Sequence, residues 1–305
     1  MTDGSITAVG TEMRSYYGRP ILKEPVWQPE IPWYFFAGGL AGASSILGLA
    51  ARAGGNEPLA KAGLYISAVG DGVSPVLLIS DLGRPERFLN MLRVFKVTSP
   101  MSVGTWILTA SGAATTLATG LELLDRAPRL KVLAEAASAL LGAPLSVYTA
   151  VLVSDTAIPV WHEARRELPF VFGASSVASA GAAAAVVVAP EYAGPARRMA
   201  VGGVAAGNAA MLAMQARLGM VGEPYRRGEA GKYHAIATVC TAAGAALLAR
   251  SAKQSRLAAV VGGGLVLAGE AALRWSVFRA GFQSARDPKY VVEPQRERIR
   301  ERKRT

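Results

Sequence analysis

Eight stretches of this chain are each about 20 residues long and consist almost entirely of apolar and small side chains. A helix needs about 20 such residues to cross the hydrocarbon core of a bilayer, and backbone groups in lipid must pair within their own segment. The chain is therefore predicted to be an all-α integral membrane protein with about eight transmembrane helices. The predicted helices cover residues 31–53, 59–80, 101–124, 131–154, 169–189, 195–216, 233–250 and 256–278.

A weak internal repeat suggests how these helices are grouped. Residues 32–41 and 169–178 share Pro, Phe, Ala and Ala at equivalent positions near the start of the first and fifth predicted helices. Helices rich in Ala and Gly match one another easily, so chance is an equal explanation. We expect two four-helix bundles, at residues 31–154 and 169–279, with a polar N-terminal segment (1–30) before them and a basic tail (280–305) after them.

An even number of crossings places both ends of the chain on one side of the membrane, which we call the terminal face. This face holds 22 Lys and Arg residues against 10 on the other, but the comparison is 13 to 10 without the tail. The positive-inside rule therefore favours a cytoplasmic terminal face only weakly.

The net charge of +11 indicates the kind of partner. The basic residues lie at helix ends and in the tail, and do not alternate with aromatics along a groove, which argues against nucleic acid. Anionic lipid head groups, or an acidic protein docked on the terminal face, fit better. The tail is either a solvated, partly disordered end of the chain or a segment that grips such a partner.

Histidine and cysteine counts limit the redox chemistry of the chain. His162 and His234 are the only histidines, one in a predicted loop and one at a predicted helix end, and cannot ligate two b-type haems. Cys240 is the only cysteine, which excludes a disulfide framework and a cysteine-ligated iron–sulfur cluster within the chain. No metal-ligand spacing is present, so we expect no metal site.

Polar and aromatic residues gather near the terminal face, at the ends of the first four predicted helices. Tyr148 lies six residues before Ser154 at the end of its helix, about 9 Å inward at the helical rise. One interpretation is the aromatic belt with long charged side chains that membrane proteins share, and the other is a binding site. The residues concerned are Glu30, Tyr34, Asp81, Arg84, Ser102, Trp106, Tyr148 and Asp155.

The turn Asp81-Leu-Gly-Arg-Pro-Glu-Arg-Phe88 is more specific than an aromatic belt. Together with four further segments it resembles the NrfD/PsrC family, the membrane anchors of polysulfide-reductase-type complexes. The resemblance covers roughly residues 16–180. The other segments are Pro32–Gly42, Thr98–Ser102 with Gly104 and Trp106, Tyr148, and Pro159-Val-Trp161.

The resemblance implies a function and a set of partners. Family members dock a ferredoxin-like iron–sulfur subunit, usually joined to a molybdopterin catalytic subunit, and exchange electrons with a quinone near the docking face. For this chain it implies a multi-pass protein of a bacterial plasma membrane that reacts with menaquinone and carries no haem.

Site residues follow from the same resemblance, position by position. Tyr148 matches the tyrosine that hydrogen-bonds a quinone carbonyl. Glu30 and Tyr34 fall where other quinone contacts are expected, although some relatives have Asn and His there. Asp81 and Arg84 match the turn beneath the iron–sulfur subunit. Ser102, Trp106 and Arg84 complete the cofactor-binding candidates, and Asp81 is a candidate proton carrier beside Glu30 and Asp155.

Three charged residues lie deeper in the predicted helices. Asp71 is mid-way along the second helix, where a carboxylate is costly and is often functional. Two roles are equally open for it: a proton path, or a hydrogen bond between helices with Asn208 or Gln215. Glu270 and Arg274 are four residues apart in the last helix and are predicted to pair on one face.

Two other functions remain open at this point. A secondary transporter also carries buried charges, kinked helices and internal repeats, but its substrate site lies at the bilayer midplane. Most candidate residues of this chain lie instead at one boundary. The third possibility is a structural anchor without a quinone site.

Overall fold

The computed structural model describes residues 20–250 and 255–303, and in that part of the chain every regular element is a helix and no strand is present. The predicted all-α fold is confirmed for these residues, while residues 1–19 of the predicted N-terminal segment lie outside them. The long helices are α1 (Glu30–Ala53), α2 (Glu57–Asp81), α4 (Pro100–Leu123), α5 (Pro128–Ser154), α7 (Leu168–Val187), α8 (Gly194–Leu218), α9 (Gly228–Arg250) and α10 (Arg256–Arg286).

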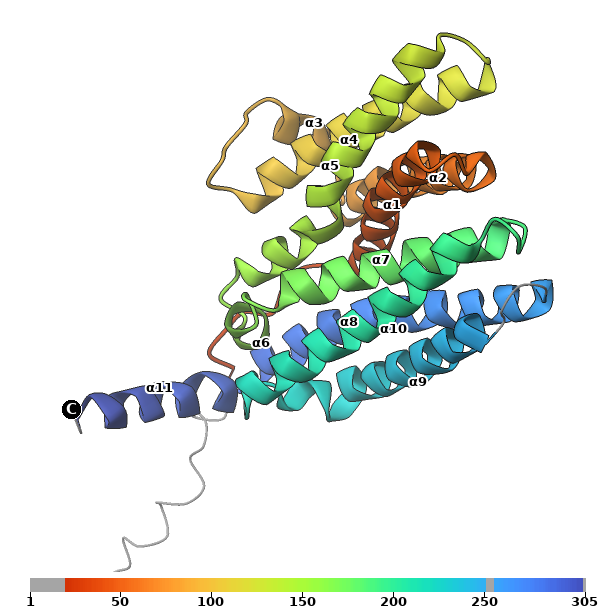
Figure 1. Cartoon of the computed structure of the whole chain (residues 1–305). Coiled ribbons are helices and arrows are strands. Elements are labelled where there is room, and N and C mark those ends of the chain that lie inside the picture. The colour runs from red at the N-terminus through yellow and green to blue at the C-terminus, as the bar shows by residue number, and fades with distance from the viewer. Residues whose placement is uncertain (1–19, 251–254, 304–305) are drawn as a thin grey trace, which may run out of the picture.

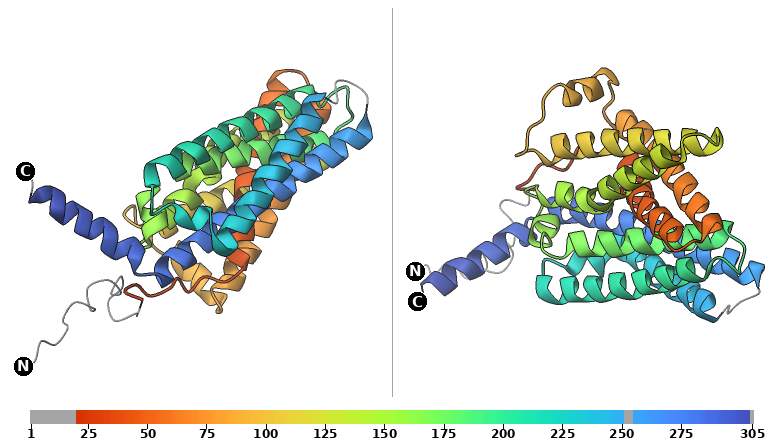
Figure 2. Two further views of the ribbon diagram at one scale, coloured as in Figure 1. Left: turned by 90° about the horizontal axis from the view of Figure 1, so that it is seen from below. Right: turned by 45° about the horizontal axis from the view of Figure 1, so that its top comes forward.

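Four shorter elements connect or follow the long helices. They are α3 (Glu86–Leu92), α6 (Pro159–Glu163), the 3-10 helix η1 (Glu223–Tyr225) and α11 (Lys289–Arg302). The segment predicted as a basic tail begins with the last turns of α10, and α11 occupies most of its remainder. Helix α11 projects beyond the ends of the other helices (Figures 1 and 2).

Six of the long helices are long and apolar enough to cross a membrane, against the eight expected from the sequence. The six are α1, α2, α5, α7, α8 and α10. Helix α4 has the length but contains seven Ser and Thr residues, and α9 begins with a polar turn that includes Lys232 and His234. Hydroxyl and charged groups lower the mean hydropathy of these two helices. The chain is thus a multi-pass membrane protein with six candidate spans.

Side-chain capping and proline fix where several of the helices begin. Asn56 accepts a hydrogen bond from the Leu59 amide at the start of α2, and Ser99 accepts one from the Ser102 amide at the start of α4. Proline follows directly in α4, as Pro100, where its missing N–H costs nothing. These signals are local, which is why the helix starts can be recognised from the sequence.

Helix α1 lies at the centre of the packing and contacts α2, α5, α7 and α10. Helices α7, α8, α9 and α10 pack together on one side of it, as Figure 1 shows. Small residues allow the close approach: a side chain added at Gly42 of α1 would overlap the carbonyl of Gly142 on α5. Such contacts replace the hydrophobic effect as the source of helix association in lipid.

Trp161 anchors the terminal end of the structure. Its side chain is completely buried, its indole Nε1 donates a hydrogen bond of 2.7 Å to the Val277 carbonyl on α10, and its ring lies against Gly281. Trp27 stacks on the same ring with centroids 5.4 Å apart. These contacts hold the segment before α1 across the terminal face, where Glu24 also pairs with Arg286.

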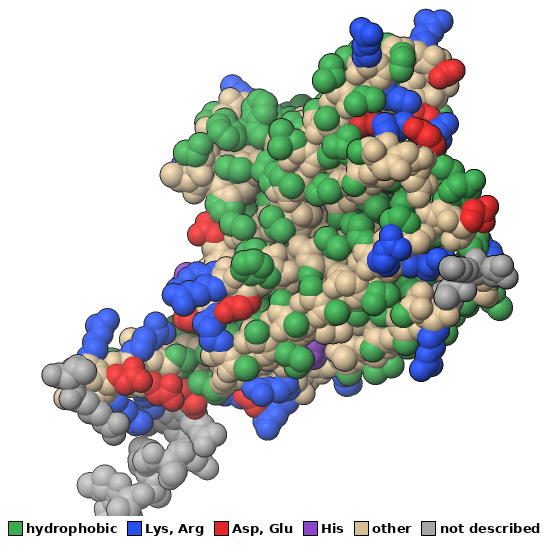
Figure 3. Space-filling model, in the orientation of Figure 1, with side chains coloured by type: hydrophobic (Ala, Val, Ile, Leu, Met, Phe, Trp, Pro, Cys, Tyr) green, Lys and Arg blue, Asp and Glu red, His purple; other side chains and the backbone are tan. Residues whose placement is uncertain are grey.

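Charged residues concentrate at the two ends of the helices. Figure 3 shows Lys, Arg, Asp and Glu there, and mainly hydrophobic and small side chains between them. At the end opposite the terminal face, one ion-pair network ties α1, α2, α4 and α5 together. Its members are Arg52, Glu57, Lys61, Glu122, Lys131 and Glu135. This distribution is what a helix bundle in a bilayer requires.

Candidate functional site

Two tyrosines predicted from the sequence meet in the structure. The hydroxyl of Tyr34, on the first turns of α1, hydrogen-bonds the hydroxyl of Tyr148 near the end of α5. Their rings meet edge to face, with centroids 6.3 Å apart. Tyr34 is completely buried, whereas 8% of Tyr148 is exposed. The pair therefore lies within the helices near the terminal face, with Tyr148 as the more accessible partner.

Gly104 of α4 lies directly against the ring of Tyr148. A Cβ atom at this position would overlap the ring atoms Cδ2, Cε2 and Cζ of the tyrosine. The glycine thus leaves room for the aromatic ring between α4 and α5. Three helices, α1, α4 and α5, contribute to this arrangement, which we call the tyrosine site and define as Tyr34, Gly104 and Tyr148.

Glu30 is the first residue of α1 and lies four residues before Tyr34, on the same face of the helix. Its carboxylate oxygen Oε2 is buried and has no hydrogen-bond partner. A buried carboxylate oxygen without a partner costs about 1–3 kcal/mol, which a bound polar group would recover. Glu30 therefore provides an unused acceptor at the terminal end of the helix that carries Tyr34.

Asp81, the last residue of α2, binds the segment that precedes α1. Its Oδ1 atom accepts a hydrogen bond of 2.7 Å from the backbone N–H of Gln28. Arg84 follows in the turn after α2, and its side chain is exposed. The turn and the segment before α1 thus form one surface on the terminal face, with Arg84 open to a partner. Asp155, the residue after α5, is also exposed.

Ser102 and Trp106 of α4 contact the loop that follows α3. The Ser102 hydroxyl donates to the Val94 carbonyl and accepts from the Lys96 N–H, each at 3.1 Å. Trp106 is 39% exposed and meets Phe95 edge to face at 6.2 Å. Among the described residues, neither side chain forms a hydrogen bond or an aromatic contact with the tyrosine pair. Their position supports the loop rather than the tyrosine site.

Asp71 of α2 is 5% exposed and is hydrogen-bonded by two hydroxyls of α4. Thr115 donates to it at 2.7 Å and Ser111 at 3.2 Å. The Thr115 hydroxyl is also 2.6 Å from that of Ser138 on α5, and the Ser138 carbonyl accepts from Ser45 on α1 at 3.2 Å. We call these five residues the Asp71 chain.

The Asp71 chain lies deeper than the tyrosine site along the same three helices. Ser45, Thr115 and Ser138 are 10 or 11 residues, about 15 Å at the helical rise, from the tyrosine-site residue of their own helix, and Ser111 is seven residues from Gly104. Thr115 and Ser138 were not singled out from the sequence. The available signal was the spacing of four between Ser111 and Thr115, which places both hydroxyls on one face of α4.

The partners suggested for Asp71 from the sequence were wrong. Asn208 and Gln215 lie on α8, which packs on α7 and α9 and belongs to the other side of the molecule. The Gln215 Nε2 atom instead lies 3.0 Å from Nε2 of His234 on α9. Helix α4 packs against α2, so its hydroxyls are the groups that reach Asp71.

The predicted pair of Glu270 and Arg274 is present only as an electrostatic interaction, without a direct contact. Both side chains are buried, but no ion pair joins them in the described structure. Arg274 Nη2 donates to the Phe172 carbonyl at 3.0 Å and to Ser176 Oγ at 3.1 Å, and the guanidinium lies 3.9 Å from the centroid of the Phe172 ring. Arg274 therefore turns to α7, because its long side chain finds carbonyl, hydroxyl and aromatic partners there.

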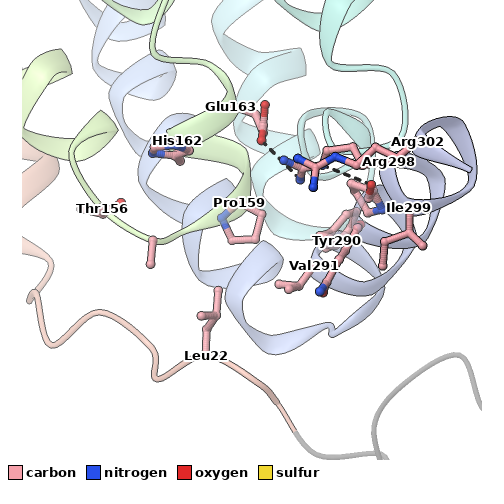
Figure 4. A pocket seen from close by; sticks show the side chains of 13 residues that line it. Leu22, Thr156, Pro159, His162, Glu163, Tyr290, Val291, Arg298, Ile299 and Arg302 are labelled. Carbon is pink, nitrogen blue, oxygen red and sulfur yellow. Dashed lines mark hydrogen bonds and ion pairs between the residues drawn. The ribbon is translucent and has the colours of Figure 1, made fainter. Parts of the chain in front are cut away.

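A groove separates α11 from the rest of the terminal face (Figure 4). Its volume is about 690 Å³, and Leu22, His162, Tyr290 and Arg298 are among the side chains that line it. Arg298 reaches Glu163 at 3.9 Å across the groove. The groove combines an apolar floor with basic groups from α11.

Helix α11 is fastened at its first turn. Glu223 of η1 accepts from Lys289 Nζ at 2.7 Å and from the Tyr290 hydroxyl at 3.2 Å, and also pairs with Arg227 at 2.6 Å. The hydrogen bond from Lys289 is the main reason why the pKa of Glu223 lies below its ordinary value, and that of Lys289 lies above its own. An ionised Glu223 thus holds the base of the helix.

Within the described residues, no group of three or more His, Cys, Asp and Glu side chains is arranged to hold a metal ion. The polar groups of the tyrosine site suit hydrogen bonding to a neutral organic molecule better than metal coordination. A model of the polysulphide reductase NrfD family matches residues 22–218, which is most of the chain. The chain belongs to the NrfD family. No curated protein matches it.

Membership of the NrfD family confirms the resemblance seen in the sequence, and makes the chain a membrane subunit of a multi-subunit reductase of the polysulphide reductase type. The matched region runs from the segment before α1 to the end of α8 and includes the tyrosine site and the Asp71 chain. Helices α9, α10 and α11 lie beyond it.

Proposed function

We propose that this NrfD-family chain exchanges electrons between an iron–sulfur subunit docked on its terminal face and menaquinone bound at the tyrosine site. In this proposal all eight long helices cross the plasma membrane of a bacterium and form two four-helix bundles. A molybdopterin subunit completes the complex and determines its substrate. The observation that carries the proposal is the hydrogen-bonded pair of Tyr34 and Tyr148 near the terminal face.

The hydrogen bond between two phenols leaves one hydroxyl proton available. When Tyr34 donates to Tyr148, the proton of Tyr148 is free to bond an acceptor outside the pair, such as a quinone carbonyl. A chain of hydroxyl groups polarises its members, so this donor is stronger than an isolated phenol. Both tyrosines are buried, and the small exposed fraction of the pair, 8%, belongs to Tyr148.

The residues around the pair fit a quinone head group. Gly104 lets the ring of Tyr148 pack directly against the backbone of α4, and Glu30 offers an unused acceptor at the terminal end of α1. The quinone supplies a two-electron, two-proton couple, so protons must reach the site. We expect Glu30, Asp81 and the exposed Asp155 to transfer protons between the site and the terminal face. The Asp71 chain is the candidate path for protons from the membrane interior.

Partner docking is proposed at two places on the terminal face. The turn after α2, with the exposed Arg84, is the first. The second is the groove beside α11, whose helix carries five Lys and Arg against three Glu. The basic groups complement an acidic surface on the iron–sulfur subunit and steer its association.

The test is the quinone reactivity of Tyr148→Phe in the purified complex. Removing the hydroxyl deletes the proposed donor while the ring still packs against Gly104. We expect the rate with menaquinol analogues to fall at least about tenfold, which corresponds to 1.4 kcal/mol in the transition state. Copurification of the iron–sulfur subunit should not change.

Tyr225→Phe is the matched control, because Tyr225 is also completely buried but its hydroxyl has no hydrogen-bond partner. This variant should keep full quinone activity. Unchanged turnover in Tyr148→Phe, with the partner still bound, would show that the chain is an anchor whose quinone site lies elsewhere. Purification without an iron–sulfur partner would instead favour a transporter.

A further inference from the structure

A line of polar side chains lies between α8, α9 and α10, three helices that contribute nothing to the tyrosine site. Asn208 and Gln215 are seven residues apart on α8, and His234, Thr238 and Thr241 follow one face of α9. Glu270 faces them from α10. Asn208, His234, Thr238, Thr241 and Glu270 line one cavity of about 10 Å³, which is the space of a single water molecule. We call these five residues, together with Gln215, the α8–α10 polar line.

Two members of this line have unsatisfied polar atoms. Glu270 is 3% exposed and its Oε2 atom has no hydrogen-bond partner, although it borders the cavity. The Nδ1 atom of His234 is also buried without a partner. Leaving such groups unpaired in a membrane interior costs several kcal/mol, so a ligand that hydrogen-bonds both is expected. A water molecule fits the volume and the chemistry.

The threonine hydroxyls of α9 are oriented so that they can accept hydrogen bonds from a water molecule in the cavity. Thr238 donates to the His234 carbonyl at 2.9 Å, and Thr241 donates to the Ala237 carbonyl at 2.8 Å. Their oxygen lone pairs are therefore left to accept hydrogen bonds from water. Gln215 lies 3.0 Å from the other ring nitrogen of His234 and continues the line toward the end of α8.

The line begins at the terminal face and ends deep inside. Gln215 is three residues from the end of α8 and His234 six residues from the start of α9, or about 5 and 9 Å at the helical rise. Glu270 lies deeper, because its neighbour Gly269 packs against Ala237 and Thr241 of α9, which are 9 and 13 residues, or about 14 and 20 Å, from the start of that helix. Beyond it toward the opposite face, Val204, Ala245, Leu248 and Val266 belong to one apolar cluster.

We propose that the α8–α10 polar line is a path for protons, carried by water, between the terminal face and an internal carboxyl at Glu270. The path is separate from the tyrosine site, and its validity does not depend on quinone binding there. It ends at Glu270, because the apolar cluster closes the way to the opposite face. Glu270 thus exchanges its proton with the terminal side.

The charged groups around Glu270 are consistent with this role. His234 is the titratable group that faces the cavity from α9, and α8 contributes only the amides of Asn208 and Gln215. Arg274 is the nearest cation on α10 and interacts electrostatically with Glu270, while its hydrogen bonds go to Phe172 and Ser176 of α7. Helix α7 itself presents hydroxyls and no charge within its span.

The experiment is infrared spectroscopy of the full-length chain in lipid nanodiscs, titrated with pH and then transferred into deuterated water. The wild-type protein should show a protonated-carboxyl band that shifts on deuteration. Glu270→Gln should remove this band. Glu135 is also buried, but its carboxylate is paired with Arg52, so Glu135→Gln should leave the band in place. Absence at every pH of a band that depends on Glu270 would overturn the proposal.

A second arm tests the path itself by comparing substitutions at the two histidines, His234 on the path and His162 away from it. His234→Leu should slow deuteration of the Glu270 carboxyl at least tenfold, because the first relay below Gln215 is lost. His162→Leu, in the groove beside α11, should not change it. Equal exchange rates in the two variants would show that protons do not pass His234. This arm uses the Glu270 side chain intact, so it remains decisive even if Glu270→Gln does not fold.

Discussion

The hydroxyl of Tyr34 on α1 is hydrogen-bonded to the hydroxyl of Tyr148 on α5, although the two residues are 114 positions apart in the chain. If Tyr148 is the donor to quinone, Tyr34 acts through it by orienting its hydroxyl. Tyr34→Phe should therefore lower quinone turnover by about tenfold or less, since a net hydrogen bond contributes about 0.5–1.5 kcal/mol. The effect should be smaller than that of Tyr148→Phe, and the double variant should be no slower than Tyr148→Phe alone. Steady-state rates of the four proteins check this, and independent, additive losses would contradict it.

Gly104 provides a prediction about packing. Gly104→Ala places a methyl group within the ring of Tyr148, so the ring must move or the helices must separate. Overpacking of this kind costs about 1–3 kcal/mol. We expect a lower midpoint of thermal unfolding in detergent together with loss of quinone turnover.

Gly112 is the matched control for this substitution, because it lies on the same helix and a Cβ atom there meets nothing within 4 Å. Gly112→Ala should preserve or slightly raise stability, since alanine favours the helix by about 1 kcal/mol over glycine. If both variants behave alike, the contact between Gly104 and Tyr148 has no consequence for the site.

Much of the fold could be predicted because it depends on short-range properties of the chain. Apolar length locates the long helices, and α2 begins and ends within two residues of the predicted 59–80. The short helix α6 could not be recognised in this way. Its position depends on Trp161, whose partner, the Val277 carbonyl, is 116 residues away.

The site was predictable in its residue types and not in its contacts. Glu270 and Arg274 have the spacing of a helix ion pair, but spacing gives only a shared face, and Arg274 finds better partners on α7. Asp71 was recognised as a buried carboxylate, whereas its partners depend on which helix packs against α2. Such pairings follow from tertiary packing, which single-sequence patterns do not contain.

The Asp71 chain gives a prediction that separates proton transfer from structure. Asp71→Asn keeps the shape and one acceptor oxygen for Thr115 but cannot release a proton. We expect proton-coupled quinone turnover to fall at least about tenfold with little change in the KM for quinone, while thermal stability is nearly retained. Asp125→Asn, at an exposed turn, is the control and should behave as the wild type. Wild-type turnover in Asp71→Asn would assign the carboxylate to helix association alone.

Thr115→Val tests the structural contribution of the same chain. The substitution keeps the volume of the side chain and removes the hydroxyl that joins Asp71 to Ser138. It should lower stability by about 1–3 kcal/mol, because buried polar atoms lose their partner. Chemical denaturation of the purified protein measures this, and an unchanged free energy of unfolding would mean that water replaces the hydroxyl.

Acid should release helix α11 from the body of the protein. Because the hydrogen bond from Lys289 lowers the pKa of Glu223 in the folded protein, the attachment is at full strength above the ordinary glutamate pKa of about 4.3 and is lost as the pH falls through the lower folded value. A spin label at Arg296→Cys, in a Cys240→Ala background, should therefore become mobile only at a pH below the ordinary pKa of glutamate. Glu223→Gln should free the helix at neutral pH and abolish the pH dependence. Glu293 of α11 forms no ion pair among the described residues, so Glu293→Gln should leave the transition unchanged. A shift of equal size in both variants would show that the general charge of the helix, and not its contact with Glu223, holds it in place.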